Sequence, residues 1–223
     1  IKRNLQGDIF MKKDNNLYIL GKKILFEESP ILYSFKATNL SEKNISEYFD
    51  IKKGQWTIED GYLIGKEPGN EGGIIYTNKK FTGDVIVTMY LGTCLPATRD
   101  VNAVWCSSWD EETDYLKDSY VCGLNGWYDG LSGLERCGEN GFYVSTSLYK
   151  YKKGEIVKMQ FGSINGHCFL FVNDELIIEM HDPHPLNEGY VGVSPYCTIL
   201  KVKEIEVRQI VFTPREQRYE PEF

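Results

Sequence analysis

The chain has 223 residues, of which 42% are hydrophobic and 13% aromatic, and its formal net charge is −7. This length is typical of one large all-β domain. The acidic balance argues against nucleic acid and against anionic membrane surfaces as partners, because both attract basic proteins. No apolar run approaches the roughly 20 residues that a membrane-spanning helix needs.

The cysteines favour a reducing compartment. All six are scattered without a C-x-x-C pair, which disfavours a zinc ribbon. Most lie in apolar contexts such as residues 104–106 and 167–169. We therefore expect six free, buried thiols and a cytoplasmic location. A removed export signal stays open, since the chain begins with Ile1 rather than Met.

The first part of the chain predicts short strands and one short helix. Apolar runs at residues 17–20 and 23–26 predict two strands, and residues 1–44 as a whole are expected to add strands to the main domain. Residues 41–48 are expected to form a short helix with Ser41 as its N-cap.

Hairpin and strand patterns follow. Residues 55–58 and 61–65 flank an acidic turn ahead of a glycine, which predicts a tight hairpin. Residues 72–77 predict another strand. Residues 84–91 are nearly all apolar or β-branched, so we expect this strand in the middle of a sheet.

The middle of the chain is the least regular part. Residues 102–147 are rich in glycine, polar groups and aromatic rings, although residues 102–107 and 115–123 each predict a strand. We expect a loop-rich insertion at residues 102–147 within a single domain that spans residues 1–223.

The last third predicts consecutive antiparallel strands. Residues 154–162 alternate polar and apolar side chains, and residues 167–172 and 175–179 flank the two-residue turn Asn173-Asp174. A polar loop then leads to residues 189–193, and an alternating strand follows at residues 199–210. Regular short strands separated by turns predict a β-sandwich.

Several of these motifs, taken in order, resemble a known superfamily. The hairpin at residues 56–63 reads W-x-I-x-D-G-x-L, residues 75–85 form a strand entry, and residues 171–177 carry a V-N-x-x-x-I hairpin. With the two final strands they resemble the concanavalin A-like jelly rolls, in particular YesU-like and 3-keto-disaccharide hydrolase-like bacterial domains. The resemblance implies an all-β fold, a concanavalin A-like jelly-roll β-sandwich of two antiparallel sheets, and a carbohydrate ligand.

Jelly rolls place ligands on one sheet face and its rim loops, which directs attention to the aromatic-polar segment 102–147. Trp105, Trp109, Trp127 and Tyr128 are candidates to stack on sugar rings, and Asn125 and Asp129 to hydrogen-bond their hydroxyl groups. The competing interpretation is a solvated loop whose aromatic rings plug the edge of the sandwich. Trp56, by contrast, is expected in the core.

Three residues are candidates for catalysis: Glu135, Arg136 and His181. In a strand, Glu135 and Arg136 would point to opposite faces, with Cys137 on the side of Glu135, so that one faces the groove and the other the outside. The competing interpretation is an exposed ion pair. His181 and His184 flank Asp182 and could bind a transition metal or shuttle a proton, although a proline-rich loop is the simpler interpretation. No metal site or cofactor is expected.

Two classes of function remain open. One is a glycoside hydrolase or lyase, because carboxylates accompany the aromatic residues. The other is a lectin-like, non-catalytic protein, because the E-x-D-x-x-E strand of jelly-roll glucanases is absent. In either case we expect a carbohydrate partner, no nucleic acid or membrane partner, and a monomer or homodimer.

Overall fold

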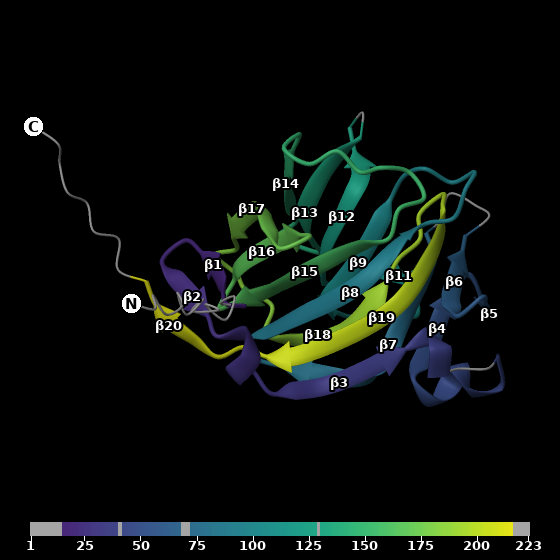
Figure 1. Cartoon of the computed structure of the whole chain (residues 1–223), viewed down its shortest axis with the longest axis horizontal. Helices are drawn as coiled ribbons and strands as arrows, with labels where there is room; N and C mark the ends of the chain where they lie inside the picture. The colour runs from purple at the N-terminus through teal and green to yellow at the C-terminus, as the bar shows by residue number, and fades with distance from the viewer. Residues whose placement is uncertain (1–14, 40–41, 68–71, 129, 216–223) are drawn as a thin grey trace, which may run out of the picture.

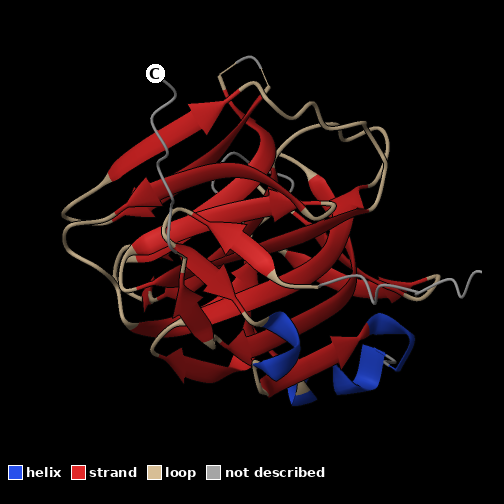
Figure 2. Cartoon of the chain, turned by 60° about the vertical axis from the view of Figure 1, so that its left-hand side comes forward, coloured by secondary structure: helices blue, strands red, loops and turns tan. Residues whose placement is uncertain are grey.

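The protein is a sandwich of two antiparallel sheets packed face to face (Figures 1 and 2). This arrangement confirms the predicted jelly-roll architecture. The computed structural model describes residues 15–39, 42–67, 72–128 and 130–215. Within the described ranges, no helix is long and apolar enough to cross a membrane.

The first sheet has seven strands and carries most of the aromatic-polar segment. Sequentially distant strands become neighbours in it, because β18 pairs with both β7 and β9. In spatial order the strands are β14 (Phe142–Thr146), β13 (Leu131–Cys137), β12 (Ser119–Trp127), β9 (Val101–Ser107), β18 (Glu188–Val193), β7 (Ile74–Thr82) and β4 (Phe49–Lys53).

The second sheet has eight strands. In spatial order they are β17 (Glu175–His181), β16 (His167–Val172), β15 (Val157–Ile164), β8 (Val85–Thr93), β19 (Ile199–Gln209), β6 (Tyr62–Lys66) and β5 (Gln55–Glu59), and β3 (Ile31–Lys36) also pairs with β19. The apolar strand β8 lies between β15 and β19, as its sequence predicts.

Two small sheets flank the sandwich. One joins β1 (Leu17–Ile19), β2 (Lys22–Ile24) and β20 (Phe212–Pro214), and Figure 1 shows it at one end of the molecule. The other is a hairpin of β10 (Trp109–Asp110) and β11 (Tyr115–Leu116). Its Trp109 and Leu116 pack on the outer face of the seven-stranded sheet, against Tyr76 and Val104.

The core lies between the two large sheets, because side chains on each strand alternate between faces. Trp105 from β9, Tyr120 from β12 and Phe161 from β15 form its aromatic centre, with ring centroids 5.0 and 5.4 Å from Trp105. Trp56 is also in this core, as predicted, and its ring lies against Gly65.

The short helical segments are of the 3-10 type: η1 (Phe26–Glu28), η2 (Ala37–Asn39) and η3 (Glu42–Glu47). The third falls where the sequence predicts a short helix, but the proposed N-cap, Ser41, lies outside the described residues.

The expectation of a loop-rich insertion at residues 102–147 is wrong. The segment supplies most or all of β9, β12, β13 and β14, which form one half of the seven-stranded sheet. Gly123, Gly126 and Gly133 lie within these strands, because other side chains lie against them: a Cβ on Gly133 would come within 2.5 Å of the Trp127 ring. Glycine here provides space on the sheet surface rather than marking a loop.

The six cysteines are all thiols in the structure. Cys106, Cys122 and Cys168 are buried as expected, whereas Cys94 and Cys137 are only half-buried. Cys197 is exposed, so the prediction of uniform burial is wrong there. It follows β18 in a turn, with a φ angle of 50°, and not in a strand.

Candidate functional site

Two pockets open on the outer face of the seven-stranded sheet, one on each side of the β10–β11 hairpin. The Trp127 pocket, of about 290 Å³, is lined by Asp100, Asn102, Tyr115, Trp127, Glu135 and Tyr196 among others. The Tyr190 pocket, of about 500 Å³, is lined by Tyr76, Lys80, Trp109, Asp118, Glu188 and Tyr190 among others. The two sets of lining residues do not overlap, because the hairpin packs directly on the sheet between them.

Trp127 is held in place at the end of β12. Its ring lies over Gly133 of β13, where any larger residue would collide with it. Its indole nitrogen donates a hydrogen bond of 3.3 Å to Oε2 of Glu135. The pocket therefore combines an aromatic ring with a carboxylate, and the hydrogen bond between them fixes the orientation of both.

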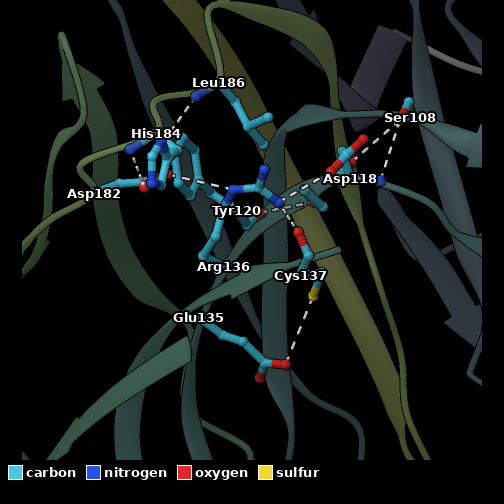
Figure 3. Close-up of polar contacts among 10 residues, drawn as sticks. Ser108, Asp118, Tyr120, Glu135, Arg136, Cys137, Asp182, His184 and Leu186 are labelled. Carbon is cyan, nitrogen blue, oxygen red and sulfur yellow. Dashed lines mark hydrogen bonds and ion pairs between the residues drawn. The ribbon is translucent and has the colours of Figure 1, made fainter. Parts of the chain in front are cut away.

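Glu135 and Arg136 point to opposite faces of β13, as the sequence predicts (Figure 3). Cys137 lies on the side of Glu135, with its sulfur 3.6 Å from Oε1. Arg136, however, does not face the outside. It is 4% exposed and points into the interior of the sandwich, so it is not available to a ligand in the Trp127 pocket.

Arg136 belongs to a buried ionic network that ties the loop after β17 to the seven-stranded sheet (Figure 3). It forms ion pairs with Asp182, at 3.3 Å, and with Asp118, at 3.0 Å, and also donates to the carbonyl of Cys137. Tyr120 donates a 2.7 Å hydrogen bond to Asp182, whose other oxygen accepts from the His184 amide. The network explains how a charged residue is accommodated inside the sandwich.

Asp100 and Asn102 line the other side of the Trp127 pocket. Asp100 is buried, and burial raises the pKa of its carboxyl group, although Arg99, whose Nε donates to it at 2.6 Å, and Asn102 act in the opposite direction. The buried Oδ1 of Asn102 has no hydrogen-bond partner among the described residues. A buried acceptor without a donor is costly, so this pocket has unused hydrogen-bonding capacity.

Only some of the sequence candidates meet in one place. Trp127 and Glu135 share a pocket, whereas Trp109 lines the Tyr190 pocket. The stacking role for Trp105 is wrong, because its ring is fully buried in the core and its Nε1 donates to Ser163 at 3.1 Å. The sequence analysis did not distinguish Trp105 from Trp127, because both fall in the aromatic-polar segment 102–147.

The other candidates lie beside or away from the Trp127 pocket. Asn125 lies in β12 where its pairing with β13 is irregular, with a φ angle of 58° and a hydrogen bond from its side-chain amide to the carbonyl of Thr98. Tyr128 is exposed and shares a 2.6 Å hydrogen bond with Tyr143. Asp129 lies outside the described residues. His181 is exposed at the end of β17, in the other sheet, and lines neither pocket.

The sequence candidates leave out most of the pocket's lining, including Asp100, Asn102, Tyr115 and Tyr196. Asp100 directly precedes β9 and adopts a positive φ angle of 58°, which a sequence pattern does not reveal. Tyr196 comes from the β18–β19 turn, which only the strand crossover brings to this site. Within the described parts of the chain, no group of three or more His, Cys, Asp or Glu side chains is arranged to hold a metal ion.

Neither protein-family models nor curated proteins match this sequence. Solved structures, however, share its architecture. A galectin-like protein of unknown function from Bacillus subtilis aligns with a TM-score of 0.64 at 13% identity, covering 82% of this chain and 98% of its own. The fold is that of the concanavalin A-like jelly rolls.

Two further neighbours have this fold. An endo-β-1,3-glucanase from Pyrococcus furiosus aligns with a TM-score of 0.60 at 12% identity, over 88% of this chain and 98% of its own. The carbohydrate-binding module CBM66 from Bacillus subtilis aligns with a TM-score of 0.54 at 14% identity, over 78% and 96%. Such identities establish the fold alone, and the finer resemblance to YesU-like domains stays a prediction.

Proposed function

We propose that the protein binds a saccharide in the Trp127 pocket. The observation that carries this proposal is the fixed Trp127 ring, which lies in one pocket with the carboxylates of Glu135 and Asp100. Sugars present apolar C–H faces and dense hydroxyl groups, which an aromatic ring and carboxylate or amide acceptors complement. The names of neighbouring structures, among them a carbohydrate-binding module and a glucanase, support the same class of ligand.

The position of the β10–β11 hairpin indicates that the ligand is a short saccharide or the end of a longer chain. It contacts the sheet between the Trp127 and Tyr190 pockets, so neither pocket continues as an open groove across the face. A long polysaccharide lying across all the strands would collide with Trp109 and Leu116. The pocket volume of about 290 Å³ is at the small end for ligand sites.

A glycan array followed by calorimetry tests the proposal. Trp127→Ala should weaken binding of the tightest array ligand by roughly 1–2 kcal/mol, because it removes the stacking surface. Tyr128→Ala is the matched control, since this neighbouring ring is exposed and does not line the pocket. Equal affinities for wild type and Trp127→Ala would place the ligand elsewhere.

A second candidate function is glycoside hydrolysis, favoured by the two carboxylates of one pocket. Burial raises the pKa of Asp100, as a general acid requires, and Glu135 is held by Trp127 as a base or nucleophile would be. In this scheme Asp100 protonates the leaving oxygen, while Glu135 activates water or attacks the sugar. Arg136 and His181 take no part in it, because they lie outside the pocket.

Reducing-sugar release from the array ligand separates hydrolysis from binding. If the protein is a hydrolase, Glu135→Gln should reduce turnover by at least about a hundredfold while calorimetric affinity changes little. Asp100→Asn should act in the same way, because its amide cannot supply a proton. Binding without detectable release by the wild-type protein would leave saccharide binding as the function.

A further inference from the structure

The outer face of the eight-stranded sheet, remote from the Trp127 pocket, carries an ordered row of polar side chains. Cross-strand pairing places Gln160 of β15 beside Thr88 of β8, and Thr88 beside Glu206 of β19. The adjacent row pairs Lys158 with Tyr90 in the same way. These residues alternate with Met159 and Met89, which point into the core.

Two hollows lie along this face, and two residues line both of them. One, of about 310 Å³, is lined by Asn15, Leu17, Gln160 and Asp174 among others, and the other, of about 210 Å³, by Ser34, Thr88, Tyr90 and Glu206 among others. Phe26 and Lys158 line both. We refer to the two hollows together as the outer groove.

Gln160 is the feature of the outer groove that points to a ligand. It is 1% exposed, and its Oε1 has no hydrogen-bond partner among the described residues. Its Nε2 makes one long hydrogen bond, 3.5 Å, to Oγ1 of Thr88. A buried amide oxygen without a donor is rare in folded proteins, and a ligand hydroxyl would satisfy it.

Phe26 provides a rigid aromatic wall. The Arg208 guanidinium lies 4.6 Å from the centre of its ring and also donates to the carbonyls of Phe26 and Ser29. The ring is therefore held from the side of Arg208 and presents its remaining surface to both hollows.

The charges around the groove are already paired, which indicates the class of ligand. Lys158 contacts Asp174 at 2.6 Å, and Arg208 contacts Glu206 at 2.6 Å. Lys36 lies 3.8 Å from Glu204, and Asn15 donates to Glu27 at 2.8 Å. A charged ligand would have to compete with these partners, whereas a neutral polyhydroxyl ligand uses the remaining donors and acceptors.

We infer that the outer groove is a second saccharide site, selective for neutral oligosaccharides. With the Trp127 pocket on the opposite sheet, it makes the chain bivalent. Two sites on one molecule increase the avidity for a surface that presents many copies of a glycan, without any new contact at either site.

Amide-resolved NMR titration of the full chain tests this inference with four probes: cellotriose, laminaritriose, xylotriose and maltotriose. In Trp127→Ala, at least one probe should still shift the Gln160 side-chain amide and the backbone amides of Thr88 and Lys158. Gln160→Ala should weaken that binding by about threefold to tenfold, through loss of hydrogen bonds. Gln55→Ala, an exposed glutamine on the edge strand β5, is the matched control and should have no effect.

The outcomes separate this inference from the proposed function. Shifts around Trp127 alone would support the proposed function and overturn the second site. Shifts at the outer groove that disappear in Trp127→Ala, or no shift there with any of the four probes, would also overturn it. If binding there requires removal of residues 1–14, that segment is the natural occupant and the saccharide assignment is wrong.

Discussion

The shape of the Trp127 pocket depends on the lack of a side chain at Gly133. A Cβ at this position would lie 2.5 Å from the Trp127 ring, so Gly133→Ala must displace the ring. We expect saccharide affinity to fall as far as in Trp127→Ala, and stability to fall by about 1–3 kcal/mol from overpacking. Calorimetry and urea unfolding measure the two effects.

The double variant Trp127→Ala/Gly133→Ala is the control for this prediction. Once the ring is gone, the alanine methyl has room, so it should cause no further loss of affinity. Additive losses would mean that Gly133 acts through something other than Trp127.

For Arg136 we predict an effect on stability rather than on saccharide binding. Arg136→Ala leaves the fully buried Asp182 carboxylate without its cation, which should cost about 3–5 kcal/mol of unfolding free energy. Lys80→Ala removes an exposed ion pair with Glu188 and should cost less than about 1 kcal/mol. Urea unfolding of both variants tests this, and similar midpoints for Arg136→Ala and wild type would contradict the assignment.

For single residues, the sequence predicts which side chains share a face of a strand better than it predicts which of them are buried. Alternation along a strand correctly separates Glu135 from Arg136 and puts Cys137 beside Glu135. It does not say which face is covered by a second sheet, so Arg136 was expected either in the groove or outside, and Trp105 at the ligand. Burial of these two residues depends on partners far along the chain, Asp182 for Arg136 and Phe161 for Trp105.

Among the elements, the β10–β11 hairpin decides which saccharides can reach the sheet. Lys52 contacts Glu111 at 2.9 Å and Lys53 contacts Asp114 at 2.8 Å, which links the hairpin to the end of β4. The variant Glu111→Lys/Asp114→Lys replaces both attractions with repulsion. We expect faster amide exchange in residues 109–116 and tighter binding of long polysaccharide relative to trisaccharide.

Affinity electrophoresis in polysaccharide gels compares the hairpin variant with wild type. The melting temperature should change little, because the two replaced carboxylates are largely exposed. Glu155→Lys/Glu175→Lys, at two exposed residues before β15 and in β17, controls for the change in net charge, which is +4 in both double variants. Unchanged selectivity despite faster amide exchange would show that the hairpin does not limit ligand length.

Many of the strands are predictable from the sequence, because they carry a local signal. The turn at Asn173 and Asp174, with φ angles of 51° and 71°, is an example. The error at residues 102–147 has a local cause too. Glycines such as Gly123 and Gly133 resemble loop signals, yet they are required within strands because Asn102 and Trp127 lie against them.

At the scale of the whole molecule, the two sheets present different surfaces to solvent. The seven-stranded sheet carries the aromatic Trp127 and Tyr190 pockets on either side of a hairpin, and the eight-stranded sheet carries the polar outer groove. The pairing of β18 with β7 and β9 brings segments more than eighty residues apart to one face. No local pattern encodes that crossover, which is why Asp100 and Tyr196 could not be assigned from the sequence.

The most direct test of the central claim is a crystal structure of the protein with its tightest oligosaccharide from the glycan array. The account predicts a sugar ring against the Trp127 indole, with hydroxyl groups within hydrogen-bonding distance of Glu135 or Asp100. A saccharide bound elsewhere, with the Trp127 pocket open and empty in the same crystal, would contradict it.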